Sequence, residues 1–212
     1  PLNEVTSKTL YVKQVGIGDC SSWNTACDLQ TAISQSVQGD EIWAAAGIYY
    51  PTTSTDRTIS FEIKNGVSIF GGFPPNGGNW ETRDWQINPT ILSGDIGTQG
   101  DISDNSYHVI KGNSSVESST ILDGLTITAG NADGASPHNL GGGMYIYSSN
   151  PTFQNVTFTA NSAVYGGGIY NNISSPAFSN VTFSENAASI MGGGMYNKNS
   201  EGVILTLSLI HI

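Results

Sequence analysis

Short runs in which apolar and polar residues alternate recur at a fixed spacing in the second half of the chain. Their apolar members are mostly β-branched or aromatic, and Gly, Asn, Ser and Pro separate the runs. Such alternation is typical of half-buried strands, because successive side chains of a strand point to opposite faces. The copies are spaced by roughly 25 residues, and self-similarity at such a period predicts a solenoid. The copies are GGGMY (141–145), GGGIY (166–170), GGGMY (192–196), PTF (151–153), PAF (176–178) and NVTF (155–158 and 180–183).

About 25 residues accommodate three short strands and three turns, which predicts that each repeat is one coil of a parallel β-helix. Successive coils of such a fold lie about 4.8 Å apart, so equivalent side chains stack in columns. Asn161 and Asn186 recur in the same Phe-x-x-Asn setting, and we expect an inward ladder that satisfies backbone groups of the turn. The expected apolar columns are Phe153 on Phe178, Phe158 on Phe183, and Met144 with Ile169 and Met195.

The segments FTAN and FSEN and the glycine triplets resemble repeats of chlamydial polymorphic outer-membrane proteins, which have Ala in place of the third Gly. Over residues 9–200 the chain is similar to a broad group of secreted bacterial right-handed β-helix proteins that often carry a "choice-of-anchor" domain. This resemblance implies an all-β, right-handed parallel β-helix in a bacterial protein exported to the cell surface or extracellular space. The segments that carry it include LYVK, DLQTAI, GDEIWAAAGIY, NGVSIFGGF, NPTILSGDIG and ILDGLTITAGNA.

The first 40 residues are expected to form a cap that consists of a strand, a loop and a helix. Asp28 is a candidate N-cap, and Gly39 is expected to end the helix. An amphipathic helix at this position covers the open end of a β-helix, which otherwise exposes strand edges and core. The apolar face of the helix is predicted to hold Leu29, Ala32, Ile33 and Val37.

Cys20 and Cys27 are the two cysteines of the chain, and they flank the loop that leads into this helix. No further Cys or paired His completes the ligand set of a zinc site. We therefore expect a disulfide that pins the loop, with two free thiols as the alternative. A disulfide fits an extracytoplasmic compartment.

The expected organisation is a cap over residues 1–40, a β-helix over 41–206 and a terminal segment at 207–212. The terminal segment breaks the repeat pattern, and we interpret it as a sequencing-adaptor artefact on a β-helix that is truncated at its C-terminal end. A coil cut short leaves strand edges unpaired, so end-to-end self-association is expected.

The excess of acidic over basic residues limits the classes of partner that the chain is expected to bind. The chain has 7 Lys and Arg against 17 Asp and Glu, which gives a net charge of −10. The basic residues are scattered, so binding to nucleic acid or to an anionic membrane surface is not expected. No apolar run approaches the length of a membrane span. The hydrophobic fraction of 38% exceeds that of disordered chains.

A Gly-rich loop contains three aspartates that are candidate ligands for Ca²⁺, the one cofactor that the sequence suggests. Asp95, Asp101 and Asp104 lie in this loop, and carboxylate oxygens are ligands that Ca²⁺ prefers. Their spacing matches no EF-hand, and a solvated acidic loop is the alternative.

Four aromatic residues are candidates for a platform on which sugar rings stack, with ordinary packing as the alternative. They are Tyr49, Tyr50, Trp80 and Trp85. The glycine triplets lack the Lys-Ser or Lys-Thr that follows in a phosphate-binding loop. We interpret the triplets as elements of tight turns and close coil stacking.

Enzymes of this fold use a base beside calcium-binding aspartates, or paired carboxylates. Lys111 and Arg83 are the bases nearest the acidic loop in the sequence, and Asp95 with Asp123 is the candidate carboxylate pair. Asp123 precedes Gly124, which favours a role in a turn for this aspartate. Acids and bases do not recur with the repeat, whereas core and turn residues do. We therefore expect a non-catalytic surface stalk, adhesin or glycan-binding passenger that meets an extracellular glycan or a host-cell partner. The alternative is a polysaccharide lyase or glycoside hydrolase.

Overall fold

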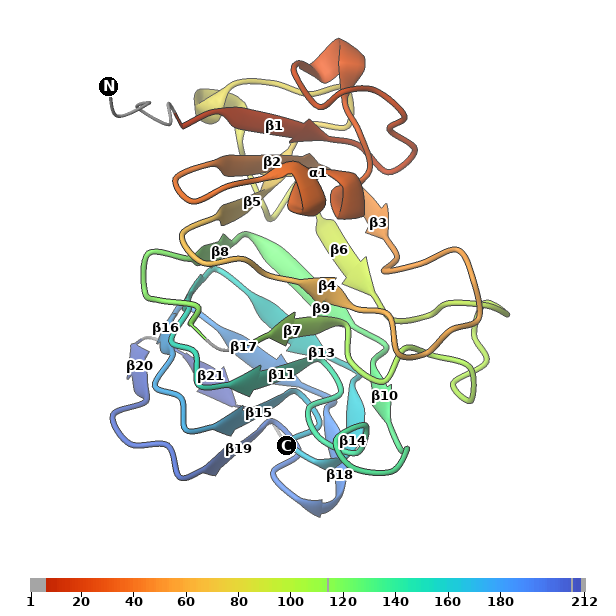
Figure 1. Cartoon of the computed structure of the whole chain (residues 1–212), viewed down its shortest axis with the longest axis vertical. Helices are drawn as coiled ribbons and strands as arrows, with labels where there is room; N and C mark the ends of the chain where they lie inside the picture. Colours follow the sequence, from red (N-terminus) through yellow and green to blue (C-terminus); the bar gives the residue numbers. More distant parts are fainter. Residues whose placement is uncertain (1–6, 114, 207, 211–212) are drawn as a thin grey trace.

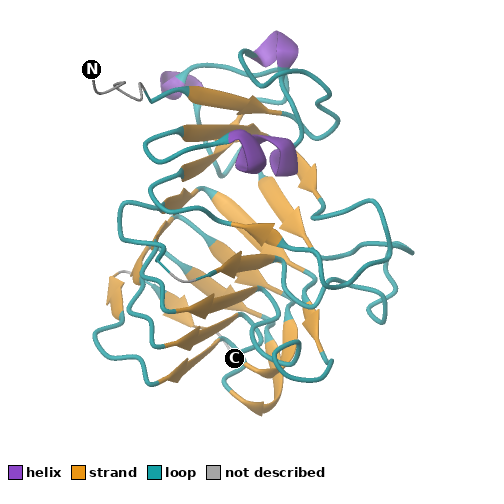
Figure 2. Cartoon of the chain, viewed as in Figure 1, coloured by secondary structure: helices purple, strands orange, loops and turns teal. Residues whose placement is uncertain are grey.

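The chain folds as a parallel β-helix, seen here in a computed structural model that describes residues 7–113, 115–206 and 208–210. Within these ranges the strands form four parallel sheets, here called A to D. The coils follow one another along the long axis of the molecule, and the short helices gather near the N-terminal end (Figure 1, Figure 2).

Each sheet collects strands that are far apart in the sequence. Sheet A has the order β1 (Thr9–Val12), β2 (Glu41–Ala45), β5 (Ser68–Phe73), β8 (Ile121–Asp123), β12 (Thr152–Gln154), β16 (Ala177–Ser179) and β20 (Ile204–Thr206). Sheet B has the order β3 (Gly47–Tyr49), β6 (Thr90–Ser93), β9 (Leu125–Thr128), β13 (Thr157–Thr159), β17 (Thr182–Ser184) and β21 (Leu209–Ile210). Sheet C has the order β4 (Phe61–Glu62), β7 (Ile110–Gly112), β11 (Met144–Tyr147), β15 (Ile169–Asn172) and β19 (Met195–Lys198). Sheet D has the order β10 (Asn131–Ala132), β14 (Ser162–Tyr165) and β18 (Ala187–Met191). The helical segments of the described ranges are η1 (Trp23–Thr25), α1 (Leu29–Gln35) and η2 (Trp80–Thr82).

The core is filled by apolar columns in the register that the repeat predicts. Phe153 pairs with Phe178 and Phe158 with Phe183, and both pairs of rings are stacked, with centroids 5.0 and 5.2 Å apart. All four rings are buried, so each removes a large apolar area from water. A third column on sheet C contains Met144, Ile169 and Met195.

Asn161 and Asn186 form the expected inward ladder at the turn between sheets B and D, where they are 1% and 9% exposed. The Oδ1 of Asn186 accepts hydrogen bonds from the backbone N and the Nδ2 of Asn161, at 3.1 and 3.0 Å. The Nδ2 of Asn186 donates to the carbonyl of Phe158 at 2.8 Å. One coil earlier, the Oδ1 of Asn161 accepts from the backbone N of Gly130. The ladder therefore satisfies turn groups that are removed from water.

A second inward ladder, made of serines, lies at the turn between sheets C and A. The Oγ of Ser174 accepts from the backbone N of Ser149 at 3.2 Å, and the Oγ of Ser200 accepts from the backbone N of Ser174 at 3.1 Å. Ser149 and Ser174 are buried. This ladder was not expected from the sequence, because serine is also a common residue of solvated turns.

The glycine triplets turn the chain and let neighbouring coils approach closely. The first glycine of a triplet, such as Gly141 with φ of +67°, adopts a left-handed conformation that favours a residue without a Cβ. The third glycine lies against the next coil, since a Cβ on Gly143 would stand 2.6 Å from the carbonyl oxygen of Gly168. The interpretation of the triplets as turning and stacking elements is confirmed.

The N-terminal segment continues the solenoid instead of standing apart from it. β1 extends sheet A by pairing with β2, and α1 packs beside β1, β2 and β4 (Figure 1). Asp28 caps α1, since its Oδ1 accepts from the backbone N of Thr31 at 2.9 Å. Leu29, Ala32 and Ile33 are buried on the inner face of the helix.

The predicted end of the helix at Gly39 is wrong. The helix α1 ends at Gln35, and Ser36 is its C-cap. Val37 therefore lies outside the helix and is 47% exposed. Residues 37–40 form a separate turn instead of a further turn of the helix. In this turn the Asp40 carboxylate accepts a hydrogen bond from the backbone N of Val37 at 2.9 Å.

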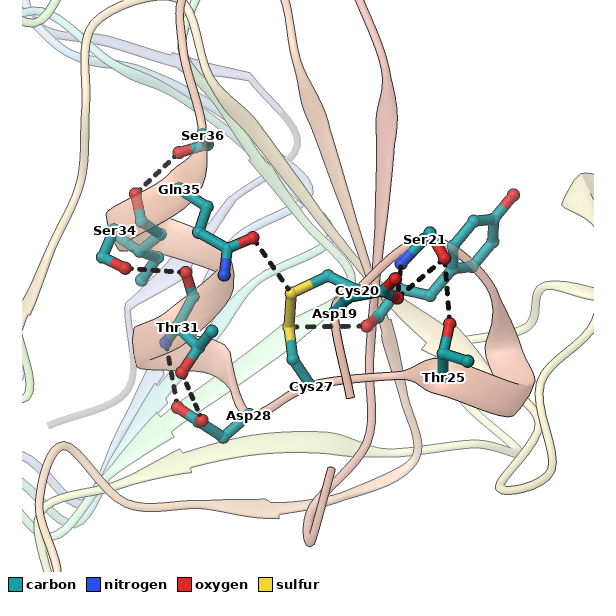
Figure 3. The surroundings of a disulfide bond; sticks show 12 residues. Asp19, Cys20, Ser21, Thr25, Cys27, Asp28, Thr31, Ser34, Gln35 and Ser36 are labelled. Carbon is teal, nitrogen blue, oxygen red and sulfur yellow. Dashed lines mark hydrogen bonds between the residues drawn. A yellow bond between two sulfur atoms is a disulfide. The ribbon is translucent and has the colours of Figure 1, made fainter. Parts of the chain in front are cut away.

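Cys20 and Cys27 form a disulfide beside α1, with Cα atoms 4.8 Å apart (Figure 3). Both residues are buried. The backbone N of Tyr11 donates to the carbonyl of Cys20 at 2.9 Å, and the backbone N of Cys27 donates to the carbonyl of Tyr11 at 3.1 Å. The bridge thus closes a loop that is already bonded to β1.

The last described strands continue sheets A and B, because β20 pairs with β16 and β21 pairs with β17. Residues 207, 211 and 212, which belong to the segment interpreted as adaptor-derived, lie outside the described residues. Across the described ranges, no helix combines the length and the apolar character that crossing a bilayer requires.

Replacing Asn186 by Ala should lower the free energy of unfolding by about 1–3 kcal/mol, because the backbone N of Asn161 and the carbonyl of Phe158 lose a buried partner. Urea unfolding followed by circular dichroism measures the change. Asn76→Ala, at an exposed loop asparagine, is the control and should behave as the parent chain. An unchanged midpoint in the Asn186 variant would contradict the role of the ladder.

Removing the disulfide with Cys20→Ser and Cys27→Ser together should lower the free energy of unfolding by about 2 kcal/mol, as expected for a cross-link that closes a short loop. Thiol titration of the unreduced protein, made in an oxidising compartment, should find no free thiol. Two titratable thiols in that sample would show that the pair stays reduced.

Candidate functional site

The outer face of sheet B carries a column of threonines. Thr126, Thr157 and Thr182 occupy equivalent positions in β9, β13 and β17. They point outward because Phe158 and Phe183, the next residues of two of these strands, point into the core. This column is one wall of a groove of about 270 Å³, here called the sheet B groove. The groove is lined by Trp85, Gln86, Gly124, Leu125, Thr126, Asn155, Thr157, Asn180 and Thr182.

Asn155 and Asn180 form an outward ladder along the sheet B groove. Both adopt a left-handed conformation in the turn from sheet A to sheet B, with φ of +52° and +54°, which asparagine tolerates better than most residues. The Nδ2 of Asn180 donates to the Oδ1 of Asn155 at 2.7 Å, and the Nδ2 of Asn155 donates to the Oδ1 of Asp123 at 2.8 Å. Asn180 is exposed, so its amide oxygen faces solvent in the groove.

Trp85 adds an aromatic side chain to the groove, from the loop between β5 and β6, and it is 36% exposed. Arg83 holds this loop in place. Its Nε donates to the carbonyl of Gly71 at 2.6 Å, and its guanidinium lies 5.0 Å from the ring of Trp80 and 5.8 Å from that of Trp85. Cation–π attraction acts at these distances, so the arginine positions both indoles.

A buried ion pair joins this loop to the turn at which the outward ladder begins. The Nη2 of Arg83 lies 3.0 Å from the Oδ1 of Asp123, and the two side chains are only 7% and 8% exposed. The contact lacks hydrogen-bond alignment, so the directional bond to the carboxylate comes from Asn155. Asp123 is therefore a structural anchor of the groove.

The sheet B groove is chemically neutral. Its lining residues, all within the described part of the chain, carry amides, hydroxyls, one indole and aliphatic groups, and none is titratable. Amides and hydroxyls exchange hydrogen bonds with sugar hydroxyls, and an indole stacks on the apolar face of a ring. The same lining offers no general acid or base.

The four aromatic residues that are candidates for a sugar platform do not form one surface, and Tyr49 is a buried residue. Tyr49 is 3% exposed, and its hydroxyl donates to the carbonyl of Ala45 at 2.8 Å. Burial raises the pKa of this tyrosine. The reason is local: residues 47–49 form the strand β3, which pairs with β6 and directs the ring inward.

The other three aromatic residues lie in different surroundings. Tyr50 lines a separate cleft between α1 and β3. Trp80 packs against Trp43 and Phe70, with centroids 5.7 and 5.1 Å away. Trp85 alone of the four lines the sheet B groove.

The three aspartates that are candidate ligands for Ca²⁺ accept hydrogen bonds within their own loop. Asp95 and Asp104 each accept a hydrogen bond from a backbone N within the loop, at 2.8 and 2.7 Å. Asp101 accepts from the backbone N and the Oγ of Ser103 at 2.9 and 2.7 Å, and these bonds lower its pKa. In the ranges that the structure describes, no three acidic, His or Cys side chains are arranged to hold a metal ion.

Each candidate catalytic residue is bonded to other groups of the fold. The Nζ of Lys111 donates to the carbonyl of Thr58 at 3.2 Å, and Arg83 is paired with Asp123. Asp123 ends β8 on sheet A and accepts from Asn155, whereas Asp95 follows β6 of sheet B and accepts from the backbone N of Gly100.

The threonine column and the outward asparagine ladder were missed from the sequence, although both belong to the recurring NVTF segment. In that segment the apolar positions were assigned to the core, and the polar positions Asn155, Thr157, Asn180 and Thr182 were given no role. The signal was their recurrence at positions that alternate with the core phenylalanines, Phe158 and Phe183.

Comparison of this chain with protein-family models, with curated proteins and with solved structures finds no match.

Replacing Arg83 by Met should lower the free energy of unfolding by about 3–5 kcal/mol, because the Asp123 carboxylate is left buried without its charge partner. Adding Asp123→Asn to that variant should recover a large part of the loss, since the remaining side chain is neutral. Urea unfolding of the parent, both single variants and the double variant measures the coupling. Equal and additive losses would show that the two residues act independently.

Proposed function

We propose that this chain is a non-catalytic glycan-binding module of an exported bacterial protein, which acts as a surface stalk, adhesin or passenger. The ligand in this proposal is a neutral oligosaccharide that lies in the sheet B groove. The observation that carries the proposal is the neutral lining, in which amide and hydroxyl columns repeat from coil to coil beside an exposed indole.

The lining suits an uncharged sugar chain for two reasons. Threonine hydroxyls and asparagine amides both donate and accept hydrogen bonds, as sugar hydroxyls do. Because the same groups recur in each coil, an extended oligosaccharide meets similar partners at successive positions, and weak contacts add up. Trp85 supplies the flat apolar contact that fixes one ring.

Two features support an exported protein. The disulfide between Cys20 and Cys27 is of a kind that persists in oxidising compartments. The resemblance of the repeats to those of secreted and surface β-helix proteins points in the same direction.

The alternative of a lyase or glycosidase receives no support from the geometry. Catalysis of either kind requires titratable groups that converge on the substrate. The sheet B groove is lined by neutral residues, and Lys111 and Asp123 bond within the fold.

Binding of a panel of neutral oligosaccharides, such as xylo-, cello- and manno-oligomers, to the purified chain tests this proposal by calorimetry. Trp85→Ala should weaken binding about tenfold, as expected from the loss of one aromatic contact. Asn180→Gly removes an amide and suits the positive φ at that position, so it should weaken binding without disturbing the turn. Ile87→Ala, on the same loop and 77% exposed, is the matched control and should bind as the parent does.

The same sample tests the absence of catalysis. Incubation with pectate, alginate, chondroitin and the neutral panel, with and without Ca²⁺, should yield neither unsaturated products nor new reducing ends. Products that disappear in Asp101→Asn or Lys111→Met would overturn the non-catalytic assignment. Lack of binding to every neutral oligosaccharide would overturn the role of the sheet B groove.

A further inference from the structure

A column of tyrosines runs along the outer face of sheet C. Tyr145, Tyr170 and Tyr196 occupy equivalent positions in β11, β15 and β19, directly after the core column of Met144 and its equivalents. Their rings are stacked, with successive centroids 5.8 and 5.5 Å apart. Tyr165, at the end of β14, packs against Tyr196 with centroids 5.6 Å apart. Each tyrosine of the column is the fifth residue of a glycine-triplet segment, so the repeat itself builds the column.

The insertion between β10 and β11 forms a wall beside this column. His138, from the insertion, stacks on Tyr107 with centroids 4.7 Å apart and lies 5.7 Å from the ring of His108. Burial lowers the pKa of His108 to about 4 and also lowers the pKa of His138, so these rings are neutral near pH 7. Between the insertion and the column lies a pocket of about 310 Å³, here called the tyrosine pocket. Ser136, Asn139, Tyr165, Tyr170, Tyr196 and Lys198 line it.

The tyrosine pocket is rich in hydrogen-bond donors. No hydrogen bond within the described part of the chain engages the hydroxyl of Tyr165, Tyr170 or Tyr196, which leaves three phenolic groups free to donate. Burial and the neighbouring tyrosines raise the pKa of Tyr170, so its hydroxyl keeps its proton. Ser136 adds a further hydroxyl to the lining.

The charge of the tyrosine pocket is opposite to that of the molecule. Lys198 forms no ion pair with a carboxylate in the described ranges, and none of the lining residues is Asp or Glu. The whole chain has a net charge of −10. An unpaired ammonium beside several hydroxyl donors therefore stands out as a local site for a negative group.

We propose that the tyrosine pocket binds the oxyanion of an acidic saccharide, that is, a sulfate ester or a carboxylate carried on a sugar ring. Lys198 neutralises the charge, and the phenolic hydroxyls of Tyr165, Tyr170 and Tyr196 donate to its oxygens. Asn139 lines the pocket beside these groups. This site lies on sheets C and D and takes a charged ligand, so it is separate from the neutral sheet B groove.

The hydrogen-bond donors of the tyrosine pocket decide which class of ligand it favours. A cation is disfavoured by Lys198, which has three donors and no acceptor. A neutral sugar leaves the ammonium without a counter-charge, whereas an oxyanion satisfies it with charge-assisted hydrogen bonds, which are about twice as strong as neutral ones. The sugar ring is favoured because the tyrosine rings that line the pocket offer an apolar contact, which a bare oxyanion cannot use.

Calorimetric titration of the full chain with three tetrasaccharides tests the proposal: a sulfated galactan (sulfate alone), a hyaluronan fragment (carboxylate alone) and cellotetraose (neutral). At least one acidic probe should bind the tyrosine pocket, and its affinity should fall as ionic strength rises. Lys198→Met should weaken that binding about tenfold or more, and Tyr165→Phe, which keeps the ring, about fivefold. Both variants should melt within a few degrees of the parent, because the altered groups form no bond within the described fold.

Two matched controls separate the tyrosine pocket from general effects. Lys8→Met removes an equal charge at an exposed site next to β1, and Tyr147→Phe removes a hydroxyl from an exposed tyrosine of β11 outside the pocket. Neither should change binding of the acidic probe. Equal weakening by Lys8→Met, no effect of Lys198→Met, or failure of both acidic probes to bind would overturn the proposal. Inorganic sulfate that binds as tightly as the sulfated tetrasaccharide would overturn its saccharide part.

The outcomes also distinguish this proposal from that for the sheet B groove. Trp85→Ala should leave the affinity for the acidic probe unchanged, and Lys198→Met should leave the affinity for a neutral oligosaccharide unchanged. Loss of both affinities in a single folded variant would show one shared site and overturn the assignment of two.

Discussion

The close spacing between successive coils is the constraint on which the rest of the structure depends. Parallel strands pair at about 4.8 Å. Where the backbone of one coil lies directly against the backbone of the next, this spacing leaves no room for a side chain. At Gly143 a single Cβ would stand 2.6 Å from the carbonyl of Gly168, so the triplets keep that space open. Where backbone groups cannot pair with the next coil, Asn161 and Asn186 bond to them from inside. The same short repeat therefore supplies both the glycines that allow close packing and the asparagines that bond to buried backbone groups.

Strict register has a second effect, which concerns the surface. A register that places Phe158 on Phe183 also places Thr157 on Thr182 outside the core. In the same way, the column that begins at Met144 carries Tyr145 beside it on the outer face of sheet C. A regular core therefore aligns the outer positions of successive coils, so residues that recur there form columns. The irregular loops then decide which parts of these columns become grooves, as the Trp85 loop and the insertion before β11 do.

The periodic part of this fold was predictable, because repetition reveals both partners of every contact. The phenylalanine columns, the Asn161–Asn186 ladder and the role of the glycines follow from residues that recur at one spacing. The pairing of Cys20 with Cys27 followed from the absence of other partners. Prediction failed where a single, unrepeated interaction decided the outcome. Tyr49 is an example, since its burial depends on whether residues 47–49 extend sheet B or turn away from it.

Charged contacts between residues that do not recur with the repeat were the hardest feature to predict. Nothing in the sequence marks Arg83 and Asp123 as partners, because an irregular loop brings one of them back over the turn that contains the other. The sequence of the loop around Asp101 fits both a solvated loop and a calcium site, since aspartates that cap their own turns and aspartates that bind Ca²⁺ occur in the same local composition. The pair Arg83–Asp123 also has an electronic consequence. Asp123, Asn155 and Asn180 form a chain in which every amide donates toward the carboxylate. Hydrogen bonds aligned in this way polarise one another, so the buried negative charge increases the electron density on the amide oxygen of Asn180. The amide oxygen of Asn180, two coils away, is thereby a stronger hydrogen-bond acceptor than that of an isolated asparagine, and the fixed charge acts on a surface group that it does not contact.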